Sequence, residues 1–291
     1  MKKFHIRVLL AVLLITLSTG CGRKHRFDYI DIASSEKTFS LLKAGFEAVP
    51  DSLPDGRSRF LLQQGVPVAD ILVYPGERPD SLAVFPEIPT GFSGELIGTE
   101  SLLDSLCVKN GHLYTEGGMN ARILYLQDER MSLKVLNKIA SLVDAGAFLA
   151  GVKPSVCLDP ENEAVFQRTV DKVWLSGNAT SGKTVKSVLK AAGVRPDVRT
   201  RVDSLTFRHL HLPDAEIYHI CNLGTHYGKA KIKFRVRGRE PKVWNPDTGE
   251  ISPVSYTLRK RSTTVLLNTV PGDDTFIVFA SFADKRKLKV K

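Results

Sequence analysis

The stretch that decides the fold is residues 209–279, HLHLPDAEIYHICNLGTHYGKAKIKFRVRGREPKVWNPDTGEISPVSYTLRKRSTTVLLNTVPGDDTFIVF. Short runs in which apolar and polar residues alternate are separated by turn-forming pairs such as Pro213-Asp214. This period of two places alternate side chains on opposite faces of a strand. Several such strands joined by short turns are typical of an all-β sandwich. We therefore predict a β-sandwich domain over residues 201–283.

Upstream of this stretch the pattern changes to strands that alternate with helices. Three apolar runs have the length of buried strands: residues 68–74, 122–127 and 147–152. Between the last two, Ser132 is a suitable N-cap for a helix that Gly146 ends, and further helices are expected after Pro160 and from about Lys183. This order predicts a parallel sheet covered by helices, which we assign to residues 56–200.

Five segments carry a family resemblance: LLQQGVPVADIL at 61–72, RILYLQDERM at 122–131, AEIYHICN at 215–222, PKVWNPDTGE at 241–250 and FIVF at 276–279. In the same order they resemble LLQQGxPVADVLY, RVLVLPDxxRM, ADIYFVAN, PELWDPVTGE and VFVVF of family 106 glycoside hydrolases, the α-L-rhamnosidases. The resemblance spans roughly residues 56–281. It implies a flavodoxin-like, glutamine-amidotransferase-like α/β domain followed by an all-β sandwich domain.

The resemblance also implies what the chain lacks. The family's catalytic barrel lies upstream of these segments, and a (β/α)₈ barrel typically needs about 250 residues. Residues 22–55, which we interpret as a tether with one helix near residues 37–48, are too few for it. We therefore expect the ancillary domains only, with no catalytic residue in the chain.

The N-terminus predicts export and lipid attachment. A basic start and an apolar run shorter than the roughly 20 residues of a transmembrane helix lead to Leu-Ser-Thr-Gly-Cys. This ending resembles a bacterial lipobox, so we expect residues 1–21 to be a lipoprotein signal peptide, with lipidation at Cys21. The membrane is then a partner through the lipid anchor, and the absence of Asp after Cys21 favours the periplasmic face of the outer membrane. A plain signal peptide is the alternative.

Charge and cysteine content exclude little. The formal net charge of +10 includes three basic residues of the signal and five in the predicted basic tail, residues 284–291. No basic cluster is interleaved with aromatic residues, so we expect no nucleic-acid partner. With Cys21 lipidated, the remaining cysteines are expected to be small buried residues: Cys107, Cys157 and Cys221.

Two motifs suggest ligands, and in both cases the local pattern argues against the site. Residues 177–184, GNATSGKT, fit the phosphate-loop motif, but that loop must follow a buried strand and here a helical pattern precedes it, so we expect no nucleotide. His209, His211 and His219 suggest zinc. Pairing across a turn at Pro213-Asp214 sets His209 opposite Tyr218 and Arg208 opposite His219, so His219 faces away and we expect no metal or other cofactor.

Hydrolytic chemistry also lacks its usual signature. Cys107 does not lie at a strand-to-helix turn, as a thiol nucleophile would. Glycoside hydrolysis needs two carboxylates about 5 to 9.5 Å apart that face one sugar site. The available acids fall in turns, caps and exposed strand positions: Glu116, Asp128, Glu129, Glu216, Asp247 and Glu250.

The sequence thus predicts an exported lipoprotein that resembles the non-catalytic ancillary domains of an α-L-rhamnosidase, truncated or split, and is associated with glycan breakdown. Its expected partner is a rhamnose-containing glycan or a separately encoded catalytic barrel. Trp244, with Tyr218 or Tyr256, is the candidate for carbohydrate contact, although Trp244 also suits a core position. The alternatives are a stand-alone glycan-binding or scaffolding lipoprotein, and an active glycoside hydrolase with an unrecognised carboxylate pair.

Overall fold

The computed structural model describes residues 35–53, 55–77 and 86–280, which all belong to one compact unit, Ser34–Lys291. The predicted signal peptide with Cys21, and the predicted basic tail at residues 284–291, lie outside the described residues. No helix in the described part of the chain combines the length and the apolar character required to cross a membrane.

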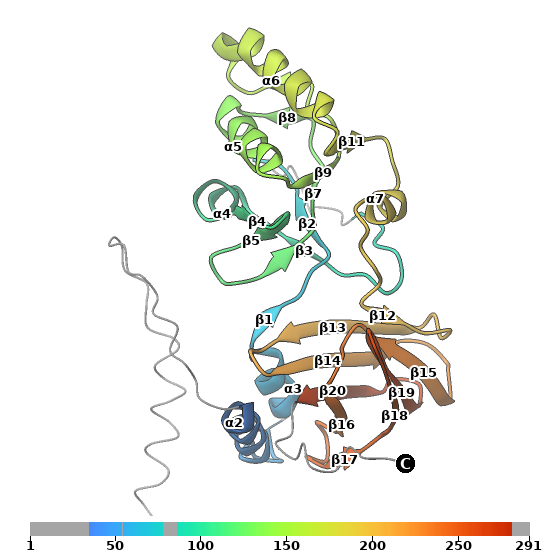
Figure 1. The fold of residues 1–291 in the computed structure, drawn as a ribbon. Coiled ribbons are helices and arrows are strands. Elements are labelled where there is room, and N and C mark those ends of the chain that lie inside the picture. The colour runs from blue at the N-terminus through green and yellow to red at the C-terminus, as the bar shows by residue number, and fades with distance from the viewer. Residues whose placement is uncertain (1–34, 54, 78–85, 281–291) are drawn as a thin grey trace, which may run out of the picture. The chain divides into compact units, whose positions relative to one another are not determined.

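A five-stranded parallel sheet occupies the middle of the sequence (Figure 1). Its strands, in spatial order, are β11 (Ala179–Ser181), β9 (Phe148–Gly151), β7 (Ile123–Leu126), β2 (Ile71–Tyr74) and β3 (Gly94–Leu96). Every residue of β2 is buried, as expected for a strand covered on both faces. The three predicted strand runs are confirmed.

Helices pack on both faces of this sheet. α5 (Leu133–Asp144) begins after Ser132, whose hydroxyl accepts a hydrogen bond from the Val135 N–H at 3.3 Å, and Gly146 follows it at a φ of 97°. One core contains α5, α6 (Glu163–Leu175) and α4 (Thr99–Asp104), and α7 (Val185–Ala191) contributes to the other. A 3₁₀ turn, η1 (Pro160–Asn162), leads into α6. The predictions of α5, α6 and α7 are confirmed, whereas the sequence pattern did not indicate α4.

Two small sheets accompany the parallel one. Three antiparallel strands form the first: β4 (Cys107–Lys109), β5 (His112–Tyr114) and β6 (Asn120–Ala121). The turn between β4 and β5 contains Asn110 and Gly111, both at positive φ, which is the residue pair that a tight hairpin favours. The second is a parallel pair, β8 (Arg130–Met131) with β10 (Val156–Cys157). Cys107 is exposed on β4, so the expectation of burial is wrong for that cysteine.

The remaining strands form two antiparallel sheets. The six-stranded sheet has the order β1 (Val66–Pro67), β13 (Leu205–His211), β14 (Ala215–Asn222), β20 (Asp274–Ala280), β16 (Glu240–Trp244) and β17 (Ile251–Pro253). The four-stranded sheet has the order β12 (Val198–Arg199), β15 (Gly228–Phe234), β19 (Ser262–Thr269) and β18 (Ser255–Arg259). The core between them is built around Tyr218, Phe234 and Phe279, whose rings meet edge to face with centroids 4.7 to 5.7 Å apart.

The hairpin of β13 and β14 has the predicted register. Arg208 pairs with His219, His209 with Tyr218, and the Leu212 N–H donates to the Ala215 carbonyl across the turn at Pro213-Asp214. Alternation along β14 then directs Tyr218 and Ile220 toward the four-stranded sheet, and Ala215 and Ile217 toward the opposite face. The two faces of β14 therefore belong to two different hydrophobic cores.

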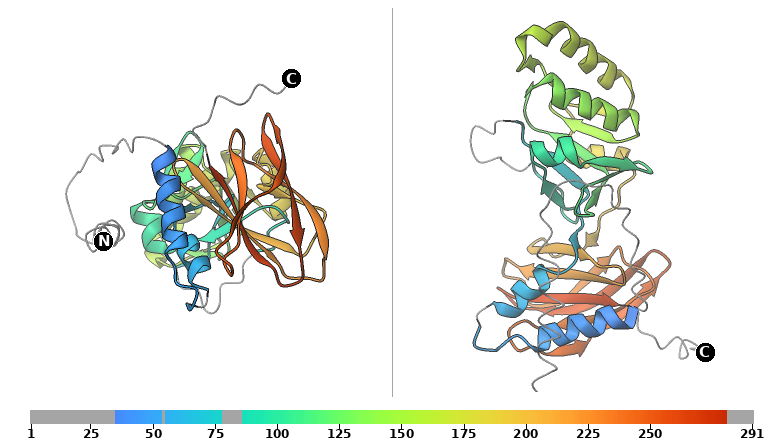
Figure 2. Two further views of the ribbon diagram at one scale, coloured as in Figure 1. Left: turned by 90° about the horizontal axis from the view of Figure 1, so that it is seen from below. Right: turned by 90° about the vertical axis from the view of Figure 1, so that its left-hand side faces the viewer.

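Two N-terminal helices cover that opposite face (Figure 2). α2 (Ser35–Glu47) confirms the helix expected near residues 37–48, and α3 (Gly56–Leu62) follows it. Phe46 of α2 meets the Trp244 ring with centroids 4.9 Å apart. The buried Arg57 of α3 donates to the carbonyl oxygens of Pro246 at 3.3 Å and Val49 at 3.2 Å. These contacts hold α2 and α3 against the six-stranded sheet and the turn after β16.

The predicted fold class, a flavodoxin-like α/β domain followed by an all-β sandwich, is wrong. The structure consists mostly of sheets: one parallel sheet of five strands with several antiparallel sheets and few helices. Its elements are not arranged in series along the chain. α2, α3 and β1 precede the parallel sheet in sequence but pack on, or pair with, the antiparallel one, where Val66 is paired with His211. The three-stranded antiparallel sheet also interrupts the expected alternation of parallel strands and helices.

Candidate functional site

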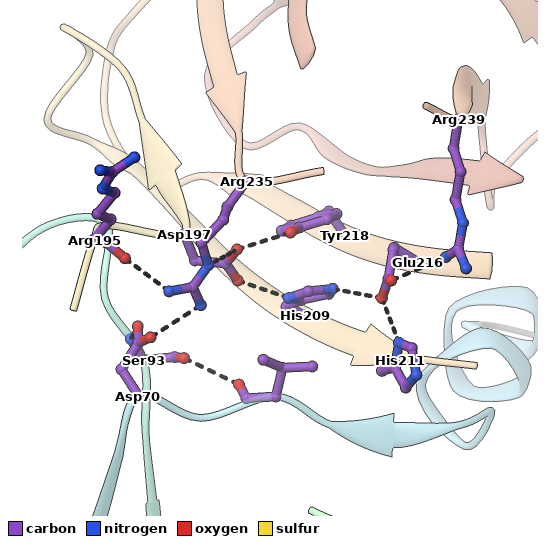
Figure 3. Close-up of polar contacts among 11 residues, drawn as sticks. Asp70, Ser93, Arg195, Asp197, His209, His211, Glu216, Tyr218, Arg235 and Arg239 are labelled. Carbon is purple, nitrogen blue, oxygen red and sulfur yellow. Dashed lines mark hydrogen bonds and ion pairs between the residues drawn. The ribbon is translucent and has the colours of Figure 1, made fainter. Parts of the chain in front are cut away.

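The most densely connected polar cluster of the described residues surrounds Asp197, the residue before β12 (Figure 3). The Asp197 side chain is 1% exposed. Its Oδ2 lies 2.6 Å from His209 Nδ1, and its Oδ1 accepts from the Tyr218 hydroxyl at 2.9 Å and lies 3.3 Å from Arg235 Nε. The His209 and Tyr218 rings are stacked with centroids 4.0 Å apart. Both carboxylate oxygens are therefore engaged.

His209 connects this carboxylate to a second one. Its Nε2 lies 3.0 Å from Oε2 of Glu216, and the same oxygen lies 2.9 Å from His211 Nδ1. The other oxygen, Oε1, accepts from Arg239 Nη1 at 2.9 Å. Glu216 was expected at an exposed strand position. The structure corrects this, because its side chain is largely covered and has three partners.

Arg235, just after β15, extends the cluster to the parallel sheet. Its Nη2 donates at 3.0 Å to Asp70, which precedes β2, and its Nη1 donates at 2.8 Å to the Arg195 carbonyl. Asp70 also accepts from the Ser93 N–H at 3.2 Å. With His209 protonated, three carboxylates balance three cations: Asp70, Asp197 and Glu216 against His209, Arg235 and Arg239.

The pKa shifts agree with this balance. Burial alone would lower the pKa of His209, but hydrogen bonds and attraction from Asp197 and Glu216 outweigh burial and raise it. Burial opposes ionisation of Asp197 and Glu216, yet their partners hold both pKa values below the usual range. For Asp70, burial dominates over Arg235 and raises the pKa. Burial also raises the pKa of Tyr218 well above its ordinary value, so this hydroxyl stays a donor.

The arrangement is suited to holding structure rather than to acid–base catalysis on a sugar. The His209 ring lies between the two carboxylates, where a glycosidase would hold the scissile bond. Removing one partner of a buried ion pair typically costs about 3 to 5 kcal/mol, because it leaves a buried charge without a partner. We conclude that this cluster fastens β2, β13, β14 and β15 to one another.

The sequence contained part of the signal for this cluster. The predicted register placed His209 opposite Tyr218, and the same register brings His211, two residues nearer the turn, opposite Glu216 on the same face of the hairpin. Asp70, Asp197 and Arg235 were missed because they lie far apart in the sequence, even though Asp70 falls within the predicted strand run 68–74. No local pattern brings them together.

A second cluster of reactive side chains lies on the opposite face of β14. His219, Cys221 and Asp274 hold one imidazole nitrogen, a thiol and a carboxylate oxygen within 4.8 Å of one another. Burial alone would lower the pKa of His219, but hydrogen bonds to Asp274 and Cys221 raise it to about 9. The prediction that His219 points away from His209 and His211 is confirmed, and its actual neighbours were not predicted.

The predicted carbohydrate-contact residues do not form one surface. Trp244 and Tyr218 have no exposed surface and belong to cores on opposite faces of the six-stranded sheet. Trp244 thus occupies the core position considered for it. Tyr256 on β18 is 39% exposed, so it alone of the three presents an accessible ring.

The structure also places the motifs that suggested nucleotide and nucleophile chemistry. α6 ends at Leu175, just before the phosphate-loop match, so a helix precedes the loop as predicted. Thr184, its last residue, caps α7 by accepting from the Ser187 N–H at 3.3 Å. Cys107 lies on an exposed antiparallel strand and not at a strand-to-helix turn.

Two of the other acids that were considered have polar partners of their own. Asp128 pairs with Arg130 at 3.2 Å, and Glu129 accepts from the Ser155 hydroxyl at 2.9 Å. The residues of the turn after β16 contact their own backbone, as when the Thr248 hydroxyl accepts from the Glu250 N–H.

A cavity of about 240 Å³ lies beside the Asp197 cluster and is rich in cations. Its lining residues are Arg195, Pro196, Arg199, Lys233, Phe234, Arg235, Arg261 and Ser262. Arg235 is neutralised by Asp70 and Asp197, and no ion pair to a carboxylate is found among the described residues for the other four cations. The cavity therefore suits an anionic ligand.

The comparisons with known proteins agree with the motifs. A model of the glycoside hydrolase 106 family, described as alpha-L-rhamnosidase, matches residues 55–258. A "Putative beta-glucuronidase" of Formosa agariphila is 32% identical over 243 residues, which are 79% of this chain and 21% of that protein. The structure of a rhamnosidase from Novosphingobium sp. PP1Y matches with a TM-score of 0.70 and 25% identity, over 81% of this chain and 25% of that one. The chain thus spans a fifth to a quarter of the length of these relatives.

The Asp197 cluster predicts a defined pH dependence of stability. The raised pKa of His209 means that its contribution is complete below about pH 6.5, its unfolded value, and is lost as the pH rises through the folded value. We expect His209→Gln to lower the free energy of unfolding, by about 3 kcal/mol at pH 6, and by less as the pH rises. Urea unfolding of both proteins from pH 5 to 9 measures this difference.

In the unmodified protein the carboxylates contribute in the opposite sense, below the pH range of this measurement. Asp197 and Glu216 stabilise above their unfolded pKa values near 4, and this contribution is lost as the pH falls through their lowered folded values. His226→Gln, outside the cluster, is the control. A His209→Gln effect that is constant over the whole range would contradict a protonated His209.

Proposed function

Because the chain belongs to glycoside hydrolase family 106, we propose that it serves glycan breakdown as a non-catalytic part of a rhamnosidase-type system. The observation that supports this most directly is the state of its best-placed carboxylates. Asp197 and Glu216 flank one histidine, both are engaged by cations or donors, and neither lines the cationic cavity. A glycosidase carboxylate must instead face the sugar and exchange a proton with it.

The proposed role is that of an ancillary region, as the motif resemblance implies. Its proposed partner is a rhamnose-containing glycan or a catalytic barrel encoded separately. The ion pairs and hydrogen bonds of the Asp197 cluster hold the sheets together. This suits the proposed role, since an ancillary region needs a rigid surface more than a strained site. The chain's match to only part of two longer enzymes is consistent with this proposal.

The purified chain is therefore expected to release no sugar from aryl α-L-rhamnosides or aryl β-glucuronides above a buffer control, because Asp197 and Glu216, the best-placed carboxylates of the described residues, are held by their partners and are not free to act as acid and base. The assay is a turnover measurement on protein shown to be folded by circular dichroism. Release that is abolished by Glu216→Gln or by Asp128→Asn, with folding intact, would establish an active site and disprove the proposal.

The cationic cavity favours a second candidate, a stand-alone glycan-binding protein with preference for acidic sugars. Arg199, Lys233 and Arg261 converge on it from three strands or turns of the four-stranded sheet. Its volume lies below the roughly 300 to 1,000 Å³ of drug-sized ligand sites, so it would hold one charged sugar residue rather than a chain segment.

We expect oligosaccharides that contain a uronic acid to bind and neutral rhamnose oligosaccharides of equal length to bind at least tenfold more weakly. Lys233→Ala and Arg261→Ala should each weaken binding about tenfold, or ~1.4 kcal/mol, and salt should weaken it further. Lys229→Ala, on the same strand but outside the cavity, is the charge-matched control. Calorimetric titration that shows equal losses for Lys229→Ala and Lys233→Ala would reject a defined site.

We further propose that the protein is exported and held at the periplasmic face of the outer membrane by a lipid on Cys21. The basic start, the short apolar run and the Leu-Ser-Thr-Gly-Cys ending support this assignment. Cells fed a palmitate analogue should label the chain, and Cys21→Ser should abolish that label while Cys107→Ser leaves it intact. Equal labelling of the Cys21→Ser chain would refute lipidation at this residue.

A further inference from the structure

His219, Cys221 and Asp274 are brought together by the register of two neighbouring strands. His219 and Cys221 are two residues apart on β14, so their side chains share a face. Asp274 begins β20 and is paired directly with Cys221. Three groups that ligate metals are thus presented side by side by hydrogen-bonded backbone rather than by loops.

The three side chains converge on one point. His219 Nε2 lies 3.4 Å from Cys221 Sγ and also contacts Asp274 Oδ1, while Sγ lies 4.0 Å from the same Oδ1. In a thiol–imidazole–carboxylate relay, the thiol and the carboxylate would face opposite nitrogens of the ring. Here Nε2, which contacts Asp274, is also the nitrogen nearer to Sγ, at 3.4 Å against 3.8 Å for Nδ1, so the three ligand atoms gather on one side as ligands around a shared ion do.

We propose that His219, Cys221 and Asp274 form a binding site for a divalent transition-metal ion of the zinc class, with one coordination position left open to solvent. Imidazole, thiolate and carboxylate bind zinc at about 2.0 to 2.3 Å, so neighbouring ligand atoms of a tetrahedral site lie roughly 3.3 to 3.8 Å apart. The two distances from Sγ are close to this range, and the contact between Nε2 and Oδ1 must widen to admit the ion.

The charge and chemistry of the ligands select the ion. A thiolate, a carboxylate and a neutral imidazole carry two negative charges, which balance a doubly charged ion. Calcium and magnesium prefer sites made of oxygen ligands, so a thiolate and an imidazole disfavour them. The site is independent of the proposed glycan role, since none of its residues belongs to the Asp197 cluster or lines the cationic cavity.

The surroundings hold the ligands in place and leave access for an ion. The His219 ring is stacked on Phe276 with centroids 4.5 Å apart. Ser58 of α3 donates to Asp274 Oδ2 at 3.3 Å, which leaves Oδ1 directed at the other two ligands. The side chains of His219 and Asp274 are 16% and 41% exposed, so solvent and ions reach the site.

Titration of the purified, metal-free chain with Co²⁺ tests the proposal, because a thiolate bound to cobalt gives a charge-transfer absorption in the near ultraviolet. We expect one equivalent of Co²⁺ per chain to bind and to give the full intensity of the absorption band. Addition of Zn²⁺ should then displace the cobalt and remove the band. Cys221→Ser should abolish the band, and His219→Ala and Asp274→Asn should each weaken binding at least tenfold. Cys107→Ser, which removes an exposed thiol elsewhere, should change nothing.

Circular dichroism of each variant shows that loss of binding is not loss of folding. Because Asp274→Asn keeps the size of the side chain and one acceptor oxygen while it removes the charge, it remains informative if His219→Ala fails to fold. A thiolate band that persists in Cys221→Ser, binding unchanged in Asp274→Asn, or no band in the unmodified chain would each overturn the proposal.

Discussion

The buried carboxylate of Asp197 is the constraint on which the arrangement of sheets depends. It is almost fully removed from water, so its charge must be met by neighbours, and the neighbours come from three other segments: His209, Tyr218 and Arg235. Arg235 in turn reaches Asp70 at the start of the parallel sheet. A hydrophobic core alone would let these layers shift against each other at low cost, whereas directional bonds to one carboxylate fix their relative positions.

How much the sequence predicted follows from the range of the interactions involved. The N-cap at Ser132 and the register across Pro213-Asp214 depend on neighbours within a few residues, and both were predicted correctly. The fold class was wrong because the pairing of Val66 with His211 and the packing of Phe46 on Trp244 join residues far apart in the chain. A two-residue strand and a short amphipathic helix carry no signal of where they will dock.

In the candidate site, too, the local features were predicted and the contacts between distant segments were not. Alternation along β13 and β14 predicted which histidines share a face, and this alternation alone separates His219 from the other two. It gave no reason to expect a carboxylate beside each group, because Asp197 and Asp274 approach from other segments of the chain. Glu216 was assigned to solvent since acids in strands usually lie there, and only Arg239 and two histidines explain why it does not.

The two faces of β14 differ in how far their polar groups are satisfied, and this decides which face has capacity for ligands. Around Asp197 every carboxylate oxygen already has a partner and the charges balance, so a ligand would have to displace existing bonds. Around Asp274 the carboxylate is partly in water and shares one imidazole nitrogen with a thiol. The thiol donates only a long, weak hydrogen bond to Asp274 Oδ1 at 4.0 Å, whereas a metal ion between the three side chains would bind all of them.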